Sequence, residues 1–250
     1  MKMKKHWKCW LPLVLLLVLL QGALGEELPR EQLTQEQLMS FYDNSVFVGD
    51  SITRQLNSYM KTQRKKDSGY FAGVKFVAAQ SLSLYRASRN SLAKSGVNLT
   101  YQGTEMPLCR ILEKMKPRRA MVLLGLNDYV GENIEQGVHN AKRIVELNQR
   151  YSPETEIIFF SLTPVTKRFS GRKHYQQLWD EYNAALEKMC REEQVPFIDI
   201  ATRLKDEEGF LYTQYSSDGR CHLNAKGLKL WVDALLEYAQ AQYDQGLWKP

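Results

Sequence analysis

The sequence predicts an α/β three-layer sandwich with a central, mostly parallel five-stranded sheet. Short, mostly apolar runs recur along the chain, as expected for strands buried on both faces of a parallel sheet, and amphipathic helical patterns separate them. The 250 residues contain no internal repeat and no low-complexity linker, which indicates one domain with a substantial core. Strand–helix alternation of this kind implies right-handed crossovers with helices on both faces of the sheet.

The expected elements follow one another in order. A polar segment with scattered apolar residues predicts a leading helix at 26–42. Strands are expected at 46–48, 74–79, 120–124, 157–160 and 196–200. Helices are expected at 52–63, 106–116, 134–150, 175–193 and 225–243. Three long connections, at 80–105, 161–174 and 201–222, each follow a strand and therefore share the rim that carries chemistry in this architecture.

Residues 1–25 have the pattern of a secretory signal. Four lysines precede an uncharged run at 9–25, and Ala23 and Gly25 supply the small residues that a signal peptidase inspects. We expect cleavage before Glu26 and a single mature domain at 26–250, in a secreted or cell-envelope location with a possible association to the envelope or membrane surface. An uncleaved N-terminal anchor is the alternative, because the run is at the short end of what spans a bilayer.

The charge of the chain owes much to this first segment. Without residues 1–25 the formal net charge falls from +6 to +2, because the segment holds four lysines and no acidic residue. So small an excess removes most of the support for nucleic acid as a partner.

Cysteine usage gives little sign of a disulfide framework or a metal site. Cys109, Cys190 and Cys221 remain after residue 25, an odd number without metal-ligand spacing. The sequence leaves open whether two of them are bonded, although Cys109 and Cys190 fit buried apolar positions. Cys221 adjoins His222, but adjacent side chains on a loop usually point apart, which disfavours a cysteine nucleophile.

The most informative stretch is 46–54, where an apolar run ends in Gly49-Asp50-Ser51 and a helical pattern begins. This places a serine hydroxyl at the carboxyl end of a strand, over the unpaired N–H groups of a helix start. Taken alone, a serine here is more often a helix cap than a nucleophile.

Two further sequence blocks favour the interpretation of Ser51 as a nucleophile over that of a helix cap. Gly125-Leu126-Asn127-Asp128 follows the apolar run 120–124, and Asp218-Gly219-Arg220-Cys221-His222 precedes the last helix. In this order and at these separations, the three blocks resemble the SGNH hydrolase family, also called GDSL-type esterases and lipases. The resemblance implies the flavodoxin-like SGNH hydrolase fold, a serine esterase activity, and no cofactor or metal.

The resemblance also implies the roles of four residues. Ser51 would be the nucleophile, His222 its base, Asp218 the residue that orients His222, and Asn127 a donor to the oxyanion. The residues themselves favour His222 among the four histidines, because it lies in a loop just before a helix, on the expected rim. The structural alternative is that Asp218-Gly219 is a turn and His222 a polar neighbour of the helix.

The sequence departs from the family pattern in two places. Three residues separate Asp218 from His222, where two are usual, and Gly219 is expected to absorb the extra one through a bulge or a positive φ. If it does not, Ser51 and His222 would act as a dyad. The second strand is followed by no glycine, so the backbone N–H of Ser81 is expected to join that of Ser51 in the oxyanion hole.

The sequence therefore predicts an exported serine esterase that removes an acyl group, first of all O-acetyl, from a cell-envelope or other carbohydrate. A lysophospholipase or short-chain acyl esterase is the second substrate hypothesis. A non-catalytic carbohydrate-binding or envelope-binding protein on the same fold is the alternative from another functional class.

The long connections contain aromatic residues that could line a pocket, although such residues more often anchor a loop to the domain. They are Phe169, Tyr175, Phe210, Tyr212 and Tyr215. The absence of Gly-x-Ser-x-Gly, H-E-x-x-H and nucleotide-binding glycine motifs argues against the α/β-hydrolase fold and against metal or dinucleotide chemistry. The oligomeric state is left open.

Overall fold

The computed structural model describes residues 31–128, 133–171 and 174–250, of which residues 33–250 belong to one compact unit. The expected signal at 1–25 and the start of the expected leading helix lie outside the described residues. In the described part of the chain, no helix is both long enough and apolar enough to cross a membrane.

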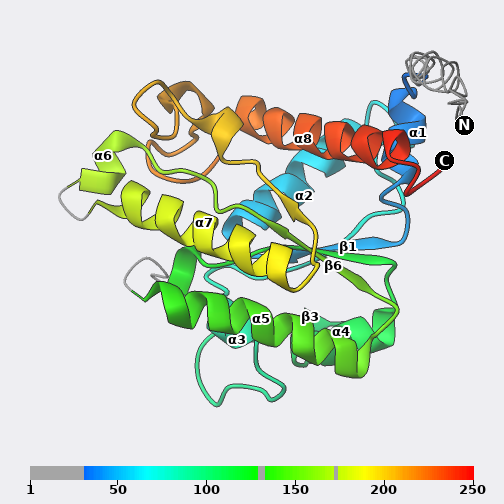
Figure 1. The fold of residues 1–250 in the computed structure, drawn as a ribbon, viewed down its shortest axis with the longest axis horizontal. Coiled ribbons are helices and arrows are strands. Elements are labelled where there is room, and N and C mark those ends of the chain that lie inside the picture. Colours follow the sequence, from blue (N-terminus) through cyan, green and yellow to red (C-terminus); the bar gives the residue numbers. More distant parts are fainter. Residues whose placement is uncertain (1–30, 129–132, 172–173) are drawn as a thin grey trace, which may run out of the picture. The chain divides into compact units, whose positions relative to one another are not determined.

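A five-stranded sheet forms the middle layer, and every pairing in it is parallel (Figure 1). The strand order is β2-β1-β5-β6-β7. The bounds are β1 Ser45–Gly49, β2 Lys75–Ala78, β5 Arg119–Leu123, β6 Glu156–Phe160 and β7 Phe197–Ile198. The chain leaves β1 toward β2 and then returns past β1 to β5, so the carboxyl ends of these strands flank a topological switch point, where open α/β sheets bind ligands.

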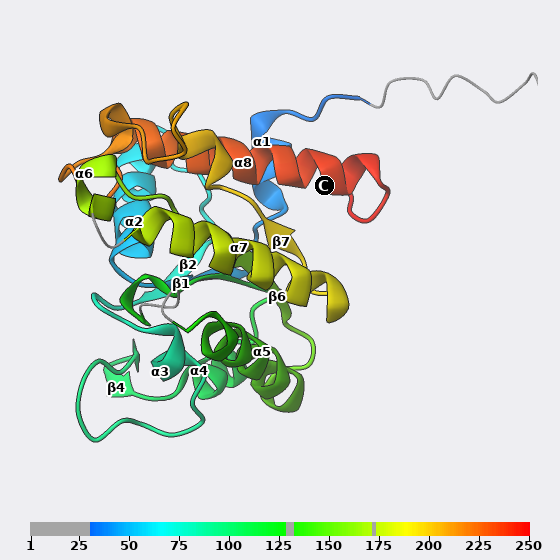
Figure 2. The same cartoon turned by 60° about the vertical axis from the view of Figure 1, so that its left-hand side comes forward.

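Helices cover both faces of the sheet, as Figures 1 and 2 show. One layer contains α1 Gln35–Ser40, α2 Ser51–Arg64 and α8 Ala225–Asp244. The other contains α4 Leu108–Met115, α5 Ile134–Tyr151 and α7 Tyr175–Glu192. Alternate strand residues feed the two cores: Phe47 packs with the first layer, whereas Val46 and Val48 pack with the second. The expected three-layer α/β sandwich is therefore confirmed.

Several elements differ in extent from the prediction. The leading helix is shorter than 26–42 in its described part, because Thr34 and Gln37 form a capping box that starts α1 at Gln35. The edge strand β7 has two residues in place of the expected five. Pro196 immediately before it has no N–H to contribute to the ladder.

The long connections contain short elements that the sequence analysis did not anticipate. Residues 80–105 hold the helix α3 Leu84–Ala87 and an antiparallel pair, β3 Thr100–Tyr101 with β4 Thr104–Glu105. The other two connections contain α6 Lys167–Ser170 and the 3₁₀ turns η4 Thr202–Leu204 and η5 Thr213–Tyr215. These pieces give parts of the connections a defined backbone geometry.

Candidate active site

Ser51 stands at the turn between β1 and α2. Asp50 caps α2 by accepting a hydrogen bond from the backbone N–H of Ile52 (2.9 Å). A Cβ atom at Gly49 would lie 1.9 Å from Thr53 Oγ1 and 2.7 Å from the carbonyl oxygen of Leu123. Only glycine therefore allows the first turn of α2 to pack this closely on the strand end, which fixes the direction in which Ser51 leaves the sheet.

His222 lies between Ser51 and Asp218. Its Nε2 is 3.0 Å from Ser51 Oγ, and its Nδ1 is 2.6 Å from Asp218 Oδ2. With Nδ1–H donating to the carboxylate, Nε2 is the acceptor that faces the serine hydroxyl. Ser51, which lies 171 positions before His222 in the chain, thus forms one continuous hydrogen-bonded row with His222 and Asp218.

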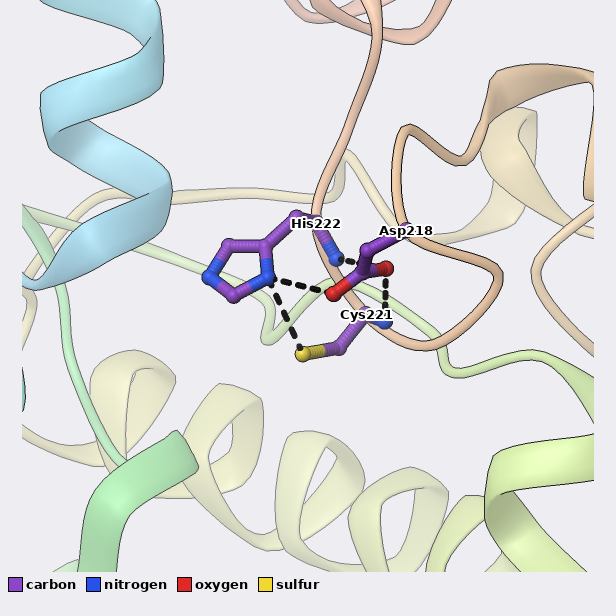
Figure 3. Close-up of side chains that lie close together, drawn as sticks. All are labelled: Asp218, Cys221 and His222. Carbon is purple, nitrogen blue, oxygen red and sulfur yellow. Dashed lines mark hydrogen bonds and ion pairs between the residues drawn. The ribbon is translucent and has the colours of Figure 1, made fainter.

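A local turn holds Asp218 and His222 on the same side of their loop. Gly219 adopts φ +68°, in the left-handed region, and Asp218 Oδ1 accepts hydrogen bonds from the backbone N–H groups of Arg220, Cys221 and His222 at 2.8, 3.2 and 3.3 Å. The extra residue between Asp218 and His222 is taken up inside this turn. Figure 3 shows the Asp218 carboxylate facing the imidazole.

The protonation of Asp218 suits this arrangement. Partial burial raises the pKa of the carboxyl, but the hydrogen bonds from the His222 side chain and from the backbone N–H groups of Arg220 and His222 outweigh it. The net pKa lies below its usual value, so the group is an anion near neutral pH and can stabilise a positively charged imidazole.

Cys221 is close to the same imidazole but is not an activated thiol. Its Sγ is 3.9 Å from His222 Nδ1, and burial, with the nearby Asp218 and Asp50 carboxylates, raises its pKa to about 12. The donor atoms of Asp218, Cys221 and His222 lie within 4.8 Å of one another, and they are the one group of metal-ligand types that the described residues bring together. A metal bound there would have to displace the proton between Nδ1 and the carboxylate.

Asn127 is hydrogen-bonded to Asp50, the residue that precedes Ser51. It lies in the 3₁₀ turn η1 Leu126–Asp128, directly after β5. Its Nδ2 donates to Asp50 Oδ2 (2.9 Å) and to the carbonyl oxygen of Leu82 (3.1 Å). Asn127 therefore connects the ends of β1 and β5 with the loop that follows β2.

Asp50 is fully buried beneath this site, and burial raises its pKa to about 6. The hydrogen bond from the Ile52 N–H and the charge of His222 act in the opposite direction. An ionised Asp50 therefore carries a desolvation cost that its hydrogen bonds only partly offset.

Ser81 occupies the position where the family pattern has a glycine, and its backbone has φ +58°. The left-handed region favours glycine, and serine adopts it here at some cost. Its side chain is exposed, and its backbone N–H has no hydrogen-bond partner among the described residues. The next helix, α3, is bonded to the turn that contains Asn127, because Asp128 accepts hydrogen bonds from the backbone N–H groups of Leu84 and Tyr85.

An open groove of about 680 Å³ extends from Ser51 and His222. One wall is the outer face of α2, from Ser51 to Gln63, and the other is formed by parts of 217–228, with Gln80 also in the lining. None of the five aromatic residues singled out in the long connections lines it. Two pairs of them contact each other instead, Phe169 with Tyr175 and Tyr212 with Tyr215. The groove residues of α2 were not predicted; Arg54 and Tyr59, which lie three and eight residues after Ser51, are among them.

All three remaining cysteines are free, so none of Cys109, Cys190 and Cys221 pairs with another. Cys109 and Cys190 are buried, as their helical patterns predict.

Comparison with known proteins supports the resemblance. The GDSL-like lipase/acylhydrolase family matches residues 47–230. An isoamyl acetate-hydrolysing esterase of Saccharomyces cerevisiae is 36% identical over 64 residues, which is 26% of this chain and 26% of that protein. The matched stretch thus spans about a quarter of the curated relative.

Solved structures share the fold at low sequence identity. A GDSL-like lipase from Bacteroides thetaiotaomicron superposes with a TM-score of 0.58 and 16% identity, over 79% of this chain and 87% of that one. An acetylxylan esterase from Geobacillus stearothermophilus, solved as a catalytic mutant, gives 0.53 and 13% identity, over 78% and 93%. Because the family match covers most of the chain, including all three sequence blocks, the protein belongs to the GDSL-like lipase/acylhydrolase family.

Proposed function

We propose that this protein is a serine esterase that hydrolyses acyl esters through an acyl-enzyme. The observation that carries the proposal is the row Ser51–His222–Asp218, with contacts of 3.0 and 2.6 Å. A serine hydroxyl is a weak nucleophile at its ordinary pKa, and a base at this distance, itself oriented by a carboxylate, is the arrangement that activates it.

In the proposed reaction, Ser51 Oγ bonds to the ester carbonyl carbon while His222 Nε2 takes the hydroxyl proton. The carbonyl oxygen becomes an oxyanion, and its collapse breaks the bond to the alcohol oxygen, which receives the proton from His222. Water then repeats the sequence on the acyl-enzyme, releasing the acid and restoring Ser51. Asp218 stabilises the imidazolium in both halves of the reaction.

The oxyanion hole would combine backbone and side-chain donors. The N–H groups of Ser51 and Ser81 lie at the ends of adjacent strands, and Asn127 supplies a carboxamide. The Asn127 amide already donates to Asp50 and to the Leu82 carbonyl, so we infer that one of these bonds is exchanged for the oxyanion as charge develops.

The substrate we propose is an O-acetylated carbohydrate. The groove beside Ser51 is open, and its lining combines hydroxyl and amide side chains with the apolar Leu223, Ala225 and Leu228; the polar groups suit a polyhydroxyl ligand. The structural neighbour from Geobacillus stearothermophilus is an acetylxylan esterase, and the yeast relative acts on an acetate ester, which favours acetyl as the acyl group. A lysophospholipid or another short acyl ester is the second substrate class to assay.

Labelling with a fluorophosphonate probe tests the esterase proposal directly, because the probe reacts with an activated serine. We expect one labelled residue, Ser51, with labelling lost in Ser51→Ala. Ser68→Ala is the matched control, since Ser68 is exposed and lies outside the groove. A folded wild-type protein that neither takes the label nor hydrolyses p-nitrophenyl acetate would favour the binding-protein alternative.

We also propose that the protein is exported and acts at or outside the cell envelope. The basis is the lysine-rich start and apolar run of residues 1–25. Fractionation of producing cells with N-terminal sequencing tests it: a mature chain that begins at Glu26 supports cleavage. A full-length chain retained in the membrane fraction supports the anchor, and a full-length chain in the cytoplasm contradicts export.

A further inference from the structure

The groove beside Ser51 is lined by one arginine, Arg54. Arg54 lies three residues after Ser51 on α2, its side chain is exposed, and both residues line the groove. Among the described residues, no carboxylate lies within ion-pair distance of Arg54. Among the described residues, the guanidinium makes one hydrogen bond, from Nη1 to Gln80 Oε1, which is 3.5 Å long and therefore weak.

Several other arginines in the described structure have closer partners. Arg64 and Arg86 donate to backbone carbonyls at 2.9 Å. Five more pair with a glutamate: Arg110, Arg119, Arg143, Arg191 and Arg203. Among the described residues that line the groove, Asp218 is the single carboxylate, and it hydrogen-bonds His222 and the backbone of its own turn instead of Arg54. The groove thus presents a positive charge next to the reacting serine.

The α2 wall of the groove consists, apart from Arg54, of neutral side chains that can form hydrogen bonds, and Leu223, Ala225 and Leu228 add apolar surface opposite. Groove residues on α2 recur every three or four positions from Ser51 to Gln63, so they form one stripe along the helix, which rises about 16 Å from Ser51 to Thr62 at 1.5 Å per residue. The hydroxyls of Ser58 and Thr62 donate back to helix carbonyls and keep their lone pairs for a ligand. A ligand lying along this stripe would meet hydroxyl and amide groups over its length and a guanidinium near the ester.

We propose that Arg54 binds an anionic group of the substrate, so that the preferred substrate is an acyl ester of an acidic sugar. A guanidinium presents a planar fork that matches a carboxylate or a phosphate, and it is more weakly hydrated than an ammonium group. The inference rests on the proposed esterase function and narrows its substrate class. Arg54 acts as a specificity residue, because it contacts the alcohol portion of the ester and takes no part in the proton transfers.

Matched acetylated sugars test this with the full chain. We would measure kcat/KM for the O-acetylated methyl glycosides of galactose, galacturonic acid and galactose 6-phosphate at neutral pH and low ionic strength. A charge-assisted hydrogen bond predicts a preference of at least about tenfold for one or both acidic sugars, expressed mainly in KM. The two acidic sugars show whether the anion is a carboxylate or a phosphate. Added salt should reduce the preference.

The variants assign the preference to one side chain. Arg54→Gln should bring the ratio of acidic to neutral kcat/KM close to one. Arg54→Lys should restore part of the ratio, because it keeps the charge and loses the fork. Lys61→Gln is the matched control, since Lys61 is an exposed cation on the same helix but outside the groove lining, and it should keep the wild-type ratio.

Two results would overturn the inference: a wild-type enzyme that does not discriminate between the sugars, or an Arg54→Gln variant that keeps the wild-type ratio. If the wild-type protein hydrolyses no ester, it is the esterase proposal that fails. Calorimetric binding of the same sugars to Ser51→Ala, with and without Arg54→Gln, then decides the question. Tighter binding of an acidic sugar that depends on Arg54 supports the inference, and equal binding of all three overturns it.

Discussion

The two halves of the candidate active site are held in different ways. Ser51 and Asn127 follow the buried central strands β1 and β5, and the buried Asp50 connects them. Asp218 and His222 lie in a loop ahead of α8, with side chains 31% and 34% exposed, and are positioned by a turn around one carboxylate oxygen. The first half inherits the rigidity of the sheet, whereas the second depends on a few local hydrogen bonds. Substitutions in the two halves should therefore affect stability and catalysis in different proportions.

The largest expected effect is in the loop half, from Asp218→Asn. The amide keeps an oxygen to accept the backbone N–H groups that shape the turn, but it loses the charge that fixes the His222 tautomer. We expect kcat to fall by about 10³–10⁴-fold, with little change in the melting temperature. Steady-state kinetics and thermal unfolding on the same preparation measure both. Near wild-type kcat would mean that Ser51 and His222 act as a dyad.

Asn127→Ala tests the sheet half. Loss of a side-chain donor to the oxyanion should lower kcat by about 10²–10³-fold and leave KM almost unchanged, because the interaction forms only as charge develops. Asn127 also bonds Asp50 and the Leu82 carbonyl, so a loss of stability should accompany the change. An unaltered kcat would remove Asn127 from the site.

Gly219→Ala probes how much the loop half depends on its turn. Gly219 has φ +68°, and an added Cβ would meet no atom within 4 Å, so the penalty is backbone strain of about 1–2 kcal/mol. A small displacement of Asp218 should lower kcat by about tenfold or more.

Gly103→Ala is its matched control. Gly103 has φ +79° in the β3–β4 turn and equally open surroundings, away from the groove. Urea unfolding should show similar destabilisation in both variants, with a loss of kcat only in Gly219→Ala. Equal kinetics in the two would show that the turn does not govern the position of Asp218.

The pH dependence of stability reports on the sheet half. Because burial raises the pKa of Asp50 from 3.8 to about 6, the folded protein binds this proton more tightly than the unfolded chain does. The contribution of Asp50 to the free energy of unfolding should therefore decrease as pH rises from about 4 to about 6, and stay constant above that. Asp50→Asn should flatten the curve in this window when urea unfolding is measured across it. An identical pH dependence in both proteins would contradict the raised pKa.

The smallest expected effect is that of Cys221→Ser. With its pKa raised to about 12, the thiol is protonated near neutral pH and has no role in the proposed reaction. We expect kcat and fluorophosphonate labelling within about twofold of wild type. A large loss of labelling would revive the cysteine-nucleophile hypothesis that the sequence raised.

The sheet was the most predictable part of the fold, for a clear physical reason. Strands buried on both faces are apolar along their whole length, so β1, β5 and β6 stand out from the helices between them. The β3–β4 pair was missed because its turn carries Gln102 and Gly103, both with positive φ, where Asn-Gly is the usual signal. The start of α1 depends on a capping box whose side-chain bonds are hard to distinguish from an ordinary polar run.

The residues of the candidate site could be predicted for a different reason. Gly49-Asp50-Ser51, Asn127 and Asp218 with His222 sit in short blocks whose residue types are tied to one reaction, so the family resemblance, now confirmed, singled them out. The groove was not predictable in this way. Arg54 and Tyr59 belong to an ordinary amphipathic helix, and nothing in their spacing distinguishes a groove wall from a solvated face.

The sequence by itself determined the order of the five sheet strands and of the long helices, the family, and which side chains are candidates for ester hydrolysis. These follow from local hydrophobic periodicity and residue type, which are written along the chain. Only the tertiary structure decided that the imidazole of residue 222 meets the hydroxyl of residue 51, and that one face of α2 borders an open groove into which it brings the guanidinium of Arg54. Such distances depend on how the parallel strands align and how α8 and its preceding loop pack beside α2, which no local pattern specifies.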